Sequence, residues 1–150
     1  MSQRGGSVVT YVRSGERVSS PVICEGEADF ILSFEELEAA RWLPYLKKDG
    51  VIVTSSQHIM PMPVITGSAV YPEDITEKLK KAGVKVVCAD AMAIAEKAGN
   101  AKAANVALIG VLSKYLGLND DVLDKALKMS VPAKLIEVNK RAYALGREQA

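Results

Sequence analysis

The sequence has no excess of charge of either sign. Its 150 residues include 19 Lys and Arg against 18 Asp and Glu, which gives a formal net charge of +1. Proteins that bind nucleic acids or other polyanions normally carry a clear basic excess. The balance therefore argues against a nucleic-acid partner, while it leaves room for a local anion site.

Long hydrophobic runs and a secretion leader are also lacking. The longest apolar runs are too short to span a bilayer, which argues against a membrane partner, and no basic-then-apolar leader precedes the fold. Cys24 and Cys88 form neither a CxxC pair nor a cluster-binding set. We therefore expect a cytoplasmic protein whose two cysteines are buried free thiols.

Residues that usually carry catalysis are equally scarce. His58 is the only histidine, and it lies in a proline-rich loop without a carboxylate nearby in the sequence. A hydrogen-bonding role within the loop is therefore favoured over catalysis. No GxSxG, GxGxxG or P-loop motif is present, and no spacing of Cys, His and Asp indicates a metal site. The sequence thus predicts no catalytic residue and no metal ligand in this chain.

Apolar runs that alternate with helical patterns are what the sequence does contain. Aromatic residues make up only 5%, so the core must come mainly from Val, Ile, Leu and Ala. Runs typical of strands buried on both faces occur at 28–34, 51–55 and 84–88. Between them, Ser33 and Glu36 are spaced as a capping box, KKDG predicts a turn, and Pro72 is placed to begin a helix that Gly83 ends. The first strand–helix–strand unit is long enough for a parallel crossover.

The two ends of the chain complete the predicted fold. Residues 7–13 alternate, Gly15 marks a turn, and residues 17–23 form a second β-like run, which predicts a hairpin. After an N-cap at Asp90, the patterns are helical from Asn100 onward, with a central helix that is apolar nearly all round and a further helix that starts at Asn119. The sequence therefore predicts one α/β domain over 1–150: three α/β/α layers around a mostly parallel or mixed sheet, with an N-terminal β-hairpin and a helical C-terminal third.

Two polar groups are candidates for ligand binding. The first is the run Gln3, Arg4, Gly5, Gly6 and Ser7, which is either a loop that meets a carboxylate or phosphate or simply a polar terminus. The second is Asn100 with Asn105. Asn100 follows Gly99, and that pair can end one helix and cap the next, whereas Asn105 lies in an apolar helix, where a buried amide needs a loop backbone or a polar pocket.

Five stretches follow one another in a recognisable order: SQRGGSVVTYVR, FEELEAAR, GVIVTSSQHIMPMPV, YPEDI and DAMAIAEKAGNAKAANVALIGVLS. Together they resemble the gamma-type domain of 2-oxoacid:ferredoxin oxidoreductases, and most of all the beta-type subunit of the indolepyruvate enzymes. The resemblance covers nearly the whole chain, and its most specific parts are SQRGGS and AGNxxxxNVxLxG. In that family the domain packs against a large partner subunit and helps to close the active site.

The resemblance implies a subunit without a cofactor of its own. In the family the large alpha-type partner carries thiamine diphosphate and iron–sulfur clusters, and the complex converts an arylpyruvate to an acyl-CoA with CoA as co-substrate and ferredoxin as electron acceptor. Residues 3–7, Asn100 and Asn105 are then candidates for the substrate, CoA or partner site.

Three other functions stay open. The first is a gamma subunit for pyruvate, 2-ketoisovalerate or 2-oxoglutarate, the second a non-catalytic binding or assembly module, and the third a stand-alone enzyme that uses His58. Members of the family also normally begin a few dozen residues earlier, with a strand and a GxGGQG-like loop. Either Met1 is an internal or misassigned start, which we favour, or the chain is a shortened relative. Without that first strand, we expect the remaining strands to expose apolar surface.

Overall fold

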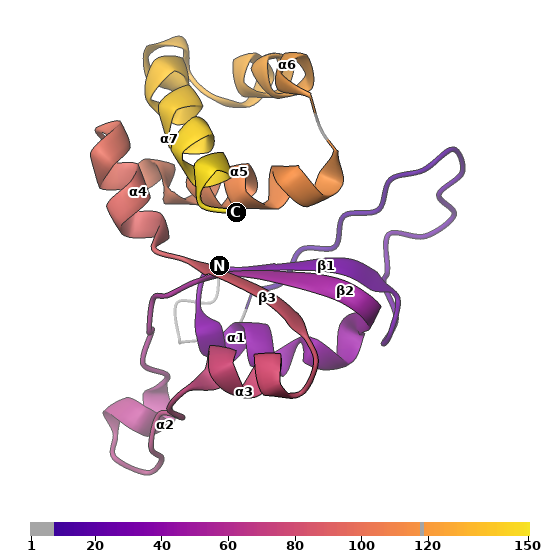
Figure 1. The fold of residues 1–150 in the computed structure, drawn as a ribbon, viewed down its shortest axis with the longest axis vertical. Helices are drawn as coiled ribbons and strands as arrows, with labels where there is room; N and C mark the ends of the chain where they lie inside the picture. Colours follow the sequence, from indigo (N-terminus) through magenta and orange to yellow (C-terminus); the bar gives the residue numbers. More distant parts are fainter. Residues whose placement is uncertain (1–7, 118) are drawn as a thin grey trace.

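A computed structural model describes residues 8–117 and 119–150 of the chain. Within them a three-stranded sheet is combined with helices on both of its faces (Figure 1). The strands are β1 (Ala28–Ser33), β2 (Leu46–Ser55) and β3 (Lys85–Ala89). The α-helices are α1 (Glu36–Arg41), α2 (Met62–Ile65), α3 (Ile75–Lys81), α4 (Ala91–Ala98), α5 (Ala104–Leu116), α6 (Asp120–Ser130) and α7 (Ile136–Glu148). Three short 3-10 helices, η1 (Leu43–Tyr45), η2 (Ala101–Ala103) and η3 (Ala133–Leu135), join them.

The sheet is parallel throughout, in the order β1-β2-β3. The predicted parallel crossover between the first two strands is confirmed. Phe30 is paired with Val51, and Val53 with Val87. The KKDG segment was expected to be a turn, and this is wrong. These residues belong to β2 and form a bulge in its pairing with β1, since Ala28 is paired with Leu46 but Phe30 already with Val51.

Successive side chains of β2 point to opposite faces of the sheet, and helices cover both faces. Ile52 packs with Ala39 of α1 and with Ile75 and Leu79 of α3. Val51 and Val53 pack on the other side in a second cluster, which takes in α4, α5 and α7. Figure 1 shows α1 and α3 below the sheet and α4, α5 and α7 above it. The predicted three-layer α/β/α architecture and helical C-terminal third are confirmed.

The helical layer is held by a close crossing of α5 and α7. Gly110 of α5 faces the Tyr143 carbonyl, and Gly146 of α7 faces the Ala107 carbonyl. A Cβ atom on either glycine would overlap that oxygen, so the two backbones touch where neither helix has a side chain. Among the described residues, no helix combines the length and apolar character that crossing a lipid bilayer requires.

The N-terminal β-hairpin is not formed. Residues 8–27, here called the arm, contain no strand, and they run outward from the body and back (Figure 1). The bend at Gly15 lies where the sequence predicts it, and the Arg13 guanidinium donates to the Val22 carbonyl at 2.7 Å. Alternation alone does not make a ladder here, because the arm has no apolar face of the protein to cover. Its valines, Val8, Val9, Val12, Val18 and Val22, are exposed.

Helix ends were predicted with mixed success. Asp90 and Asn119 cap α4 and α6, and Gly83 follows the end of α3, as expected. The cap of α1 is Glu35 rather than Ser33, and α3 begins at Ile75, after Pro72.

Candidate functional site

The predicted binding residues fall into two groups. Gln3, Arg4, Gly5, Gly6 and Ser7 lie outside the described residues. Asn100 does cap the turn after α4: Gly99 ends that helix with φ 108°, and the Asn100 side chain accepts from the Lys102 N–H at 3.0 Å. The predicted helix-end role of the Gly99–Asn100 pair is therefore confirmed.

Asn105 was expected to be a buried amide, and this is wrong. It is exposed at the start of α5, on the same side as Ile109 and Leu116, which are also partly exposed. The sheet, α4 and α7 cover the rest of α5 and leave this stripe open. In the described part of the chain, no hydrogen bond joins Asn105 to Asn100.

A cluster of titratable side chains that sequence reasoning did not assemble lies where the three strands end. Glu35 and Glu36 follow β1, His58 follows β2, and Cys88 lies near the end of β3. Parallel strands end at one edge of a sheet, and in open α/β folds this edge is where ligands commonly bind. Tyr71 joins the cluster from the segment before α3.

Glu35 is only 4% exposed, and its two carboxylate oxygens are both engaged. One accepts from the Glu38 N–H at 2.8 Å, which caps α1, and the other accepts from the Tyr71 hydroxyl. Burial, together with this bond and the charge of Glu35, raises the pKa of Tyr71 well above its usual value. Tyr71 thus stays a hydrogen-bond donor to a buried carboxylate.

Glu36 is 9% exposed and serves two neighbours. Its Oε2 is 3.7 Å from Nε2 of His58, and its Oε1 is 3.7 Å from the Cys88 Sγ. Burial raises the pKa of Cys88 to about 11, and the charge of Glu36 acts in the same direction. A thiol with a raised pKa is a poor nucleophile, so the cluster does not present Cys88 as an activated cysteine.

His58 and Tyr71 also contact each other, with ring centroids 5.0 Å apart. The carboxylate partner that His58 lacks in the sequence is supplied in space by Glu36. The arrangement supports the loop-holding role of His58, because both rings tie the segment between them to the start of α1. The clearest sequence signal was the pair of acids directly after a buried strand.

The two thiols differ from expectation. Cys24 and Cys88 are free, as predicted, but both residues are exposed rather than buried. The thiol of Cys88 is nevertheless partly shielded from solvent where it meets Glu36, and this partial burial is what raises its pKa. Cys24 lies in the arm, and Cys88 lies in β3, which has no further strand beside it in the described part of the chain. Among these residues, no three His, Cys, Asp or Glu side chains gather as a metal ion would require.

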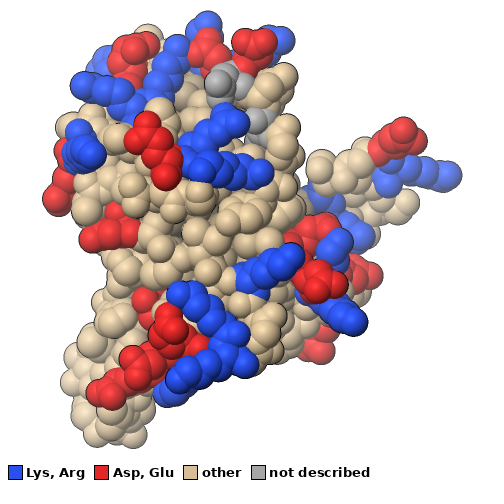
Figure 2. All heavy atoms as spheres, in the orientation of Figure 1, with Lys and Arg blue, Asp and Glu red and all other residues tan. Residues whose placement is uncertain are grey.

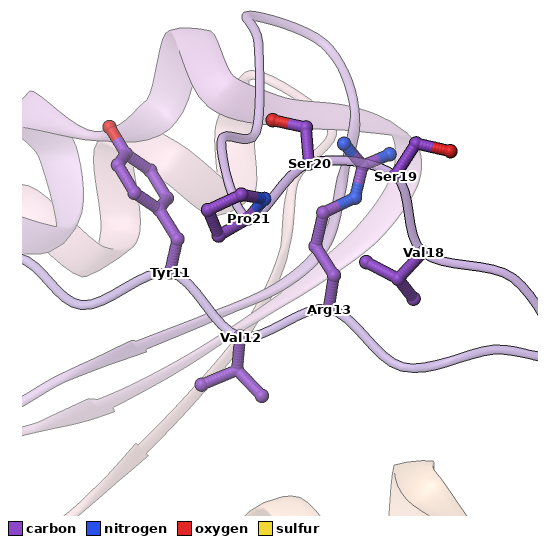
Figure 3. Close-up of a pocket in the computed structure, with 7 residues that line it drawn as sticks. All are labelled: Tyr11, Val12, Arg13, Val18, Ser19, Ser20 and Pro21. Carbon is purple, nitrogen blue, oxygen red and sulfur yellow. The ribbon is translucent and has the colours of Figure 1, made fainter.

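A cavity of about 400 Å³ lies within the arm, between Tyr11 and Pro21 (Figure 3). Arg13 extends across it toward Ser19 and Ser20. The arm is anchored at Tyr11, whose ring lies 6.4 Å from those of Trp42 and Tyr45. All residues that line the cavity come from the arm, so the sheet does not shape it.

A second hollow, of about 550 Å³, lies between α5, α6 and α7. Its cations are engaged: Lys140 pairs with Asp124, Lys114 donates to the Ala150 carbonyl, and Arg147 also has a partner. The Tyr143 hydroxyl beside it is buried without a hydrogen-bond partner among the described residues. These contacts tie the C-terminal helices together and leave no cation for a ligand.

Comparison with known proteins gives one consistent result. The model of the family described as pyruvate ferredoxin/flavodoxin oxidoreductase matches residues 1–149. The indolepyruvate oxidoreductase subunit IorB of Thermococcus kodakarensis is 44% identical over all of this chain and 77% of that protein. The subunit of the same name from Pyrococcus horikoshii is 41% identical with the same coverage.

More distant matches agree with this. The ketoisovalerate oxidoreductase subunit VorA of Methanothermobacter marburgensis is 24% identical over 99% of this chain and 28% of that protein. Among solved structures, the gamma subunit of a keto/oxoacid ferredoxin oxidoreductase from Geobacter sulfurreducens matches with a TM-score of 0.60 at 20% identity. It covers 86% of this chain and 68% of its own. At this identity the match shows a shared fold.

Proposed function

Because the chain belongs to the pyruvate ferredoxin/flavodoxin oxidoreductase family, we propose that it is a subunit of an indolepyruvate-type 2-oxoacid:ferredoxin oxidoreductase. The observation that carries this proposal is its similarity, over its full length, to subunits named for indolepyruvate. The subunit named for ketoisovalerate is less similar and is matched over a smaller share of its length. An arylpyruvate is therefore the better supported substrate.

The chemistry of this chain favours an auxiliary role over a cofactor-bearing one. Its buried carboxylates are occupied in holding Tyr71, His58 and Cys88, and its described residues do not gather the donors that an iron–sulfur cluster needs. In the proposal, thiamine diphosphate and iron–sulfur clusters belong to a large alpha-type partner. CoA is the co-substrate, and ferredoxin accepts the electrons. This chain completes and scaffolds the site.

Reconstitution tests the proposal. The chain is mixed with the cofactor-bearing partner subunit, and ferredoxin reduction is followed with indolepyruvate and CoA. We expect reduction that depends on both compounds and on this chain. A panel of pyruvate, 2-ketoisovalerate and 2-oxoglutarate in the same assay identifies the preferred substrate.

Two results would contradict the proposal. One is a partner whose activity is unchanged when this chain is omitted, which would leave a binding or assembly module. The other is turnover by the purified chain alone that is lost in His58→Ala, which would indicate a stand-alone enzyme.

A further inference from the structure

Residues 59–70, here called the apolar lobe, protrude from the body beside α3 (Figure 1). The lobe contains α2 and follows His58, and Tyr71 comes directly after it. From Gly50 to Pro72 the sequence has no Lys, Arg, Asp or Glu. Figure 2 shows the lobe as a projection without a charged side chain.

The side chains of the lobe are apolar and open to solvent. Val70 is 90% exposed, Ile65 64% and Met62 52%, with Ile59 and Met60 also exposed. A soluble surface rarely gathers so many large apolar residues without a charge among them, and such patches mark interaction sites. Depletion of charge and enrichment in Met are also typical of the buried centre of a protein interface.

The lobe is held in one shape from within. The Pro63 carbonyl accepts from the N–H groups of Ser68 at 2.9 Å and Ala69 at 3.0 Å. The Ser68 hydroxyl donates to the same oxygen at 3.0 Å. Pro61 and Pro63 restrict the backbone further.

The lobe is also closed at its base. The rings of His58 and Tyr71 meet there. The Tyr71 hydroxyl donates to the buried carboxylate of Glu35, and Oε2 of the buried Glu36 lies 3.7 Å from Nε2 of His58. A compact loop of about 6–16 residues whose ends meet is an Ω-loop, a type that frequently carries function. A preorganised shape lowers the entropy cost of binding.

We infer that the apolar lobe is the element that docks this chain into an uncharged apolar recess of the cofactor-bearing partner subunit. The inference rests on the proposed function, because relatives named as subunits work in an assembly. The shape and the lack of charge call for a recess of matching character. The whole lobe is presented as one rigid projection, as an anchor in a protein interface would be.

Two other occupants fit less well. A second copy of this chain offers, among the described residues, a hollow between α5, α6 and α7 lined with charged side chains and an arm cavity that holds Arg13. An anionic lipid surface needs basic residues, whereas the lobe has none, and the first charged residues after it are the exposed acids Glu73 and Asp74.

The test measures binding of the full chain to the partner subunit. Met62→Asp and Ile65→Asp each place a charge on the lobe, and Met129→Asp is the matched control, since Met129 is 87% exposed on α6, far from the lobe (Figure 1). We expect each lobe variant to raise the dissociation constant about tenfold or more, and the control to change it less than about twofold. Unchanged thermal unfolding of all three variants establishes that they are folded.

Each outcome decides a separate point. If wild-type chain binds the partner and the lobe variants bind equally well, the inference about the lobe is wrong while the proposed function stands. If wild-type chain does not bind the partner at all, the proposed function fails. Self-association of the chain, or binding to vesicles of neutral and anionic phospholipids, that the lobe variants alone abolish would overturn the choice of partner.

Discussion

At the scale of single residues, Glu35 and Glu36 are the two buried acids of the described chain, and they lie side by side in sequence. A buried carboxylate is costly unless hydrogen-bond donors or charges compensate it. Glu35 receives a backbone N–H and the Tyr71 hydroxyl, and Glu36 lies against His58 and Cys88. The two acids therefore join three strand ends to the base of the apolar lobe.

Cys88 provides the pH prediction. Its pKa of about 11, against an ordinary value of 9.0, means about a hundredfold less thiolate at neutral pH. We expect alkylation by iodoacetamide to be slow near neutrality and to rise steeply toward pH 11. The folded chain holds this proton more tightly than the unfolded chain. The thiol's contribution to stability is therefore present below about pH 9 and is lost as the pH rises through about 11.

Glu36→Gln tests how much the charge of Glu36 contributes to the raised pKa of Cys88. It removes the negative charge beside the thiol, so Cys88 should be labelled faster than in wild type at the same pH, in a Cys24→Ser background followed by mass spectrometry. Glu38→Gln, in the same helix but away from the thiol, is the control. Equal labelling rates in wild type and Glu36→Gln would show that burial alone sets the pKa.

At the scale of elements, the C-terminal layer depends on how closely its helices approach. α5 and α7 meet backbone to backbone at Gly110 and Gly146, and α6 packs on α7 through Leu127 and Tyr143. Lys128 and Lys140 hold the pKa of Asp124 down at about 2. Asp124 therefore stays ionised at neutral pH and links α6 to Lys140 of α7.

Gly146→Ala tests the crossing of α5 and α7. At an open helix position this change would stabilise by about 1 kcal/mol. Here the added methyl group meets the Ala107 carbonyl, so we expect a loss of about 1–3 kcal/mol or more in the free energy of unfolding. Urea denaturation measures the difference.

The control for this variant lies in the same helix. Ala144 is exposed on α7, and Ala144→Gly should cost only the helix propensity of about 1 kcal/mol. A Gly146→Ala protein that is more stable than wild type would show that the helices can separate at no cost.

At the scale of the whole molecule, a compact layered body carries two projections, the arm and the apolar lobe (Figure 1). Many of the exposed large apolar residues of the described chain lie on these projections. They cost the isolated chain free energy that an assembly would recover by covering them. This arrangement fits a subunit, and it separates the packed core from the apolar lobe that is proposed to contact the partner.

Arg4 is expected to act at this scale. If residues 3–7 contact substrate, CoA or the partner, Arg4→Ala should lower the activity of the assembled complex about tenfold or more, because a lost charged hydrogen bond costs about 1.5–3 kcal/mol. The melting temperature of the subunit should not change. Arg17→Ala, on the exposed arm, is the control. Equal activity of Arg4→Ala and wild type would show that Arg4 contacts no ligand, which favours the interpretation of residues 3–7 as simply a polar terminus.

The sequence by itself determined where the three strands lie, the helical C-terminal third and the caps at Asp90 and Asn119. Each of these features follows from apolar periodicity or from a hydrogen bond between a side chain and a nearby backbone N–H. Both depend only on residues that are neighbours in the sequence. The sequence also predicted all three strands to be buried on both faces, and this is wrong for β1 and β3, since among the described residues only β2 has a strand on each side and is largely buried. The motif order likewise predicted the family, which the match over residues 1–149 confirms. The arm escaped this reasoning, because alternation predicts a strand only where a sheet is present to pair with it.

Only the tertiary structure decided which distant residues meet. The contacts of Glu36 with His58 and of Glu35 with Tyr71 join residues that are far apart in the sequence. No local sequence pattern shows that such residues meet in space. The contact of Gly110 and Gly146 with opposing carbonyls likewise depends on how two helices cross. Asn105 looked buried because its helix is apolar, yet burial depends on which faces the neighbouring elements cover, and they leave this one open.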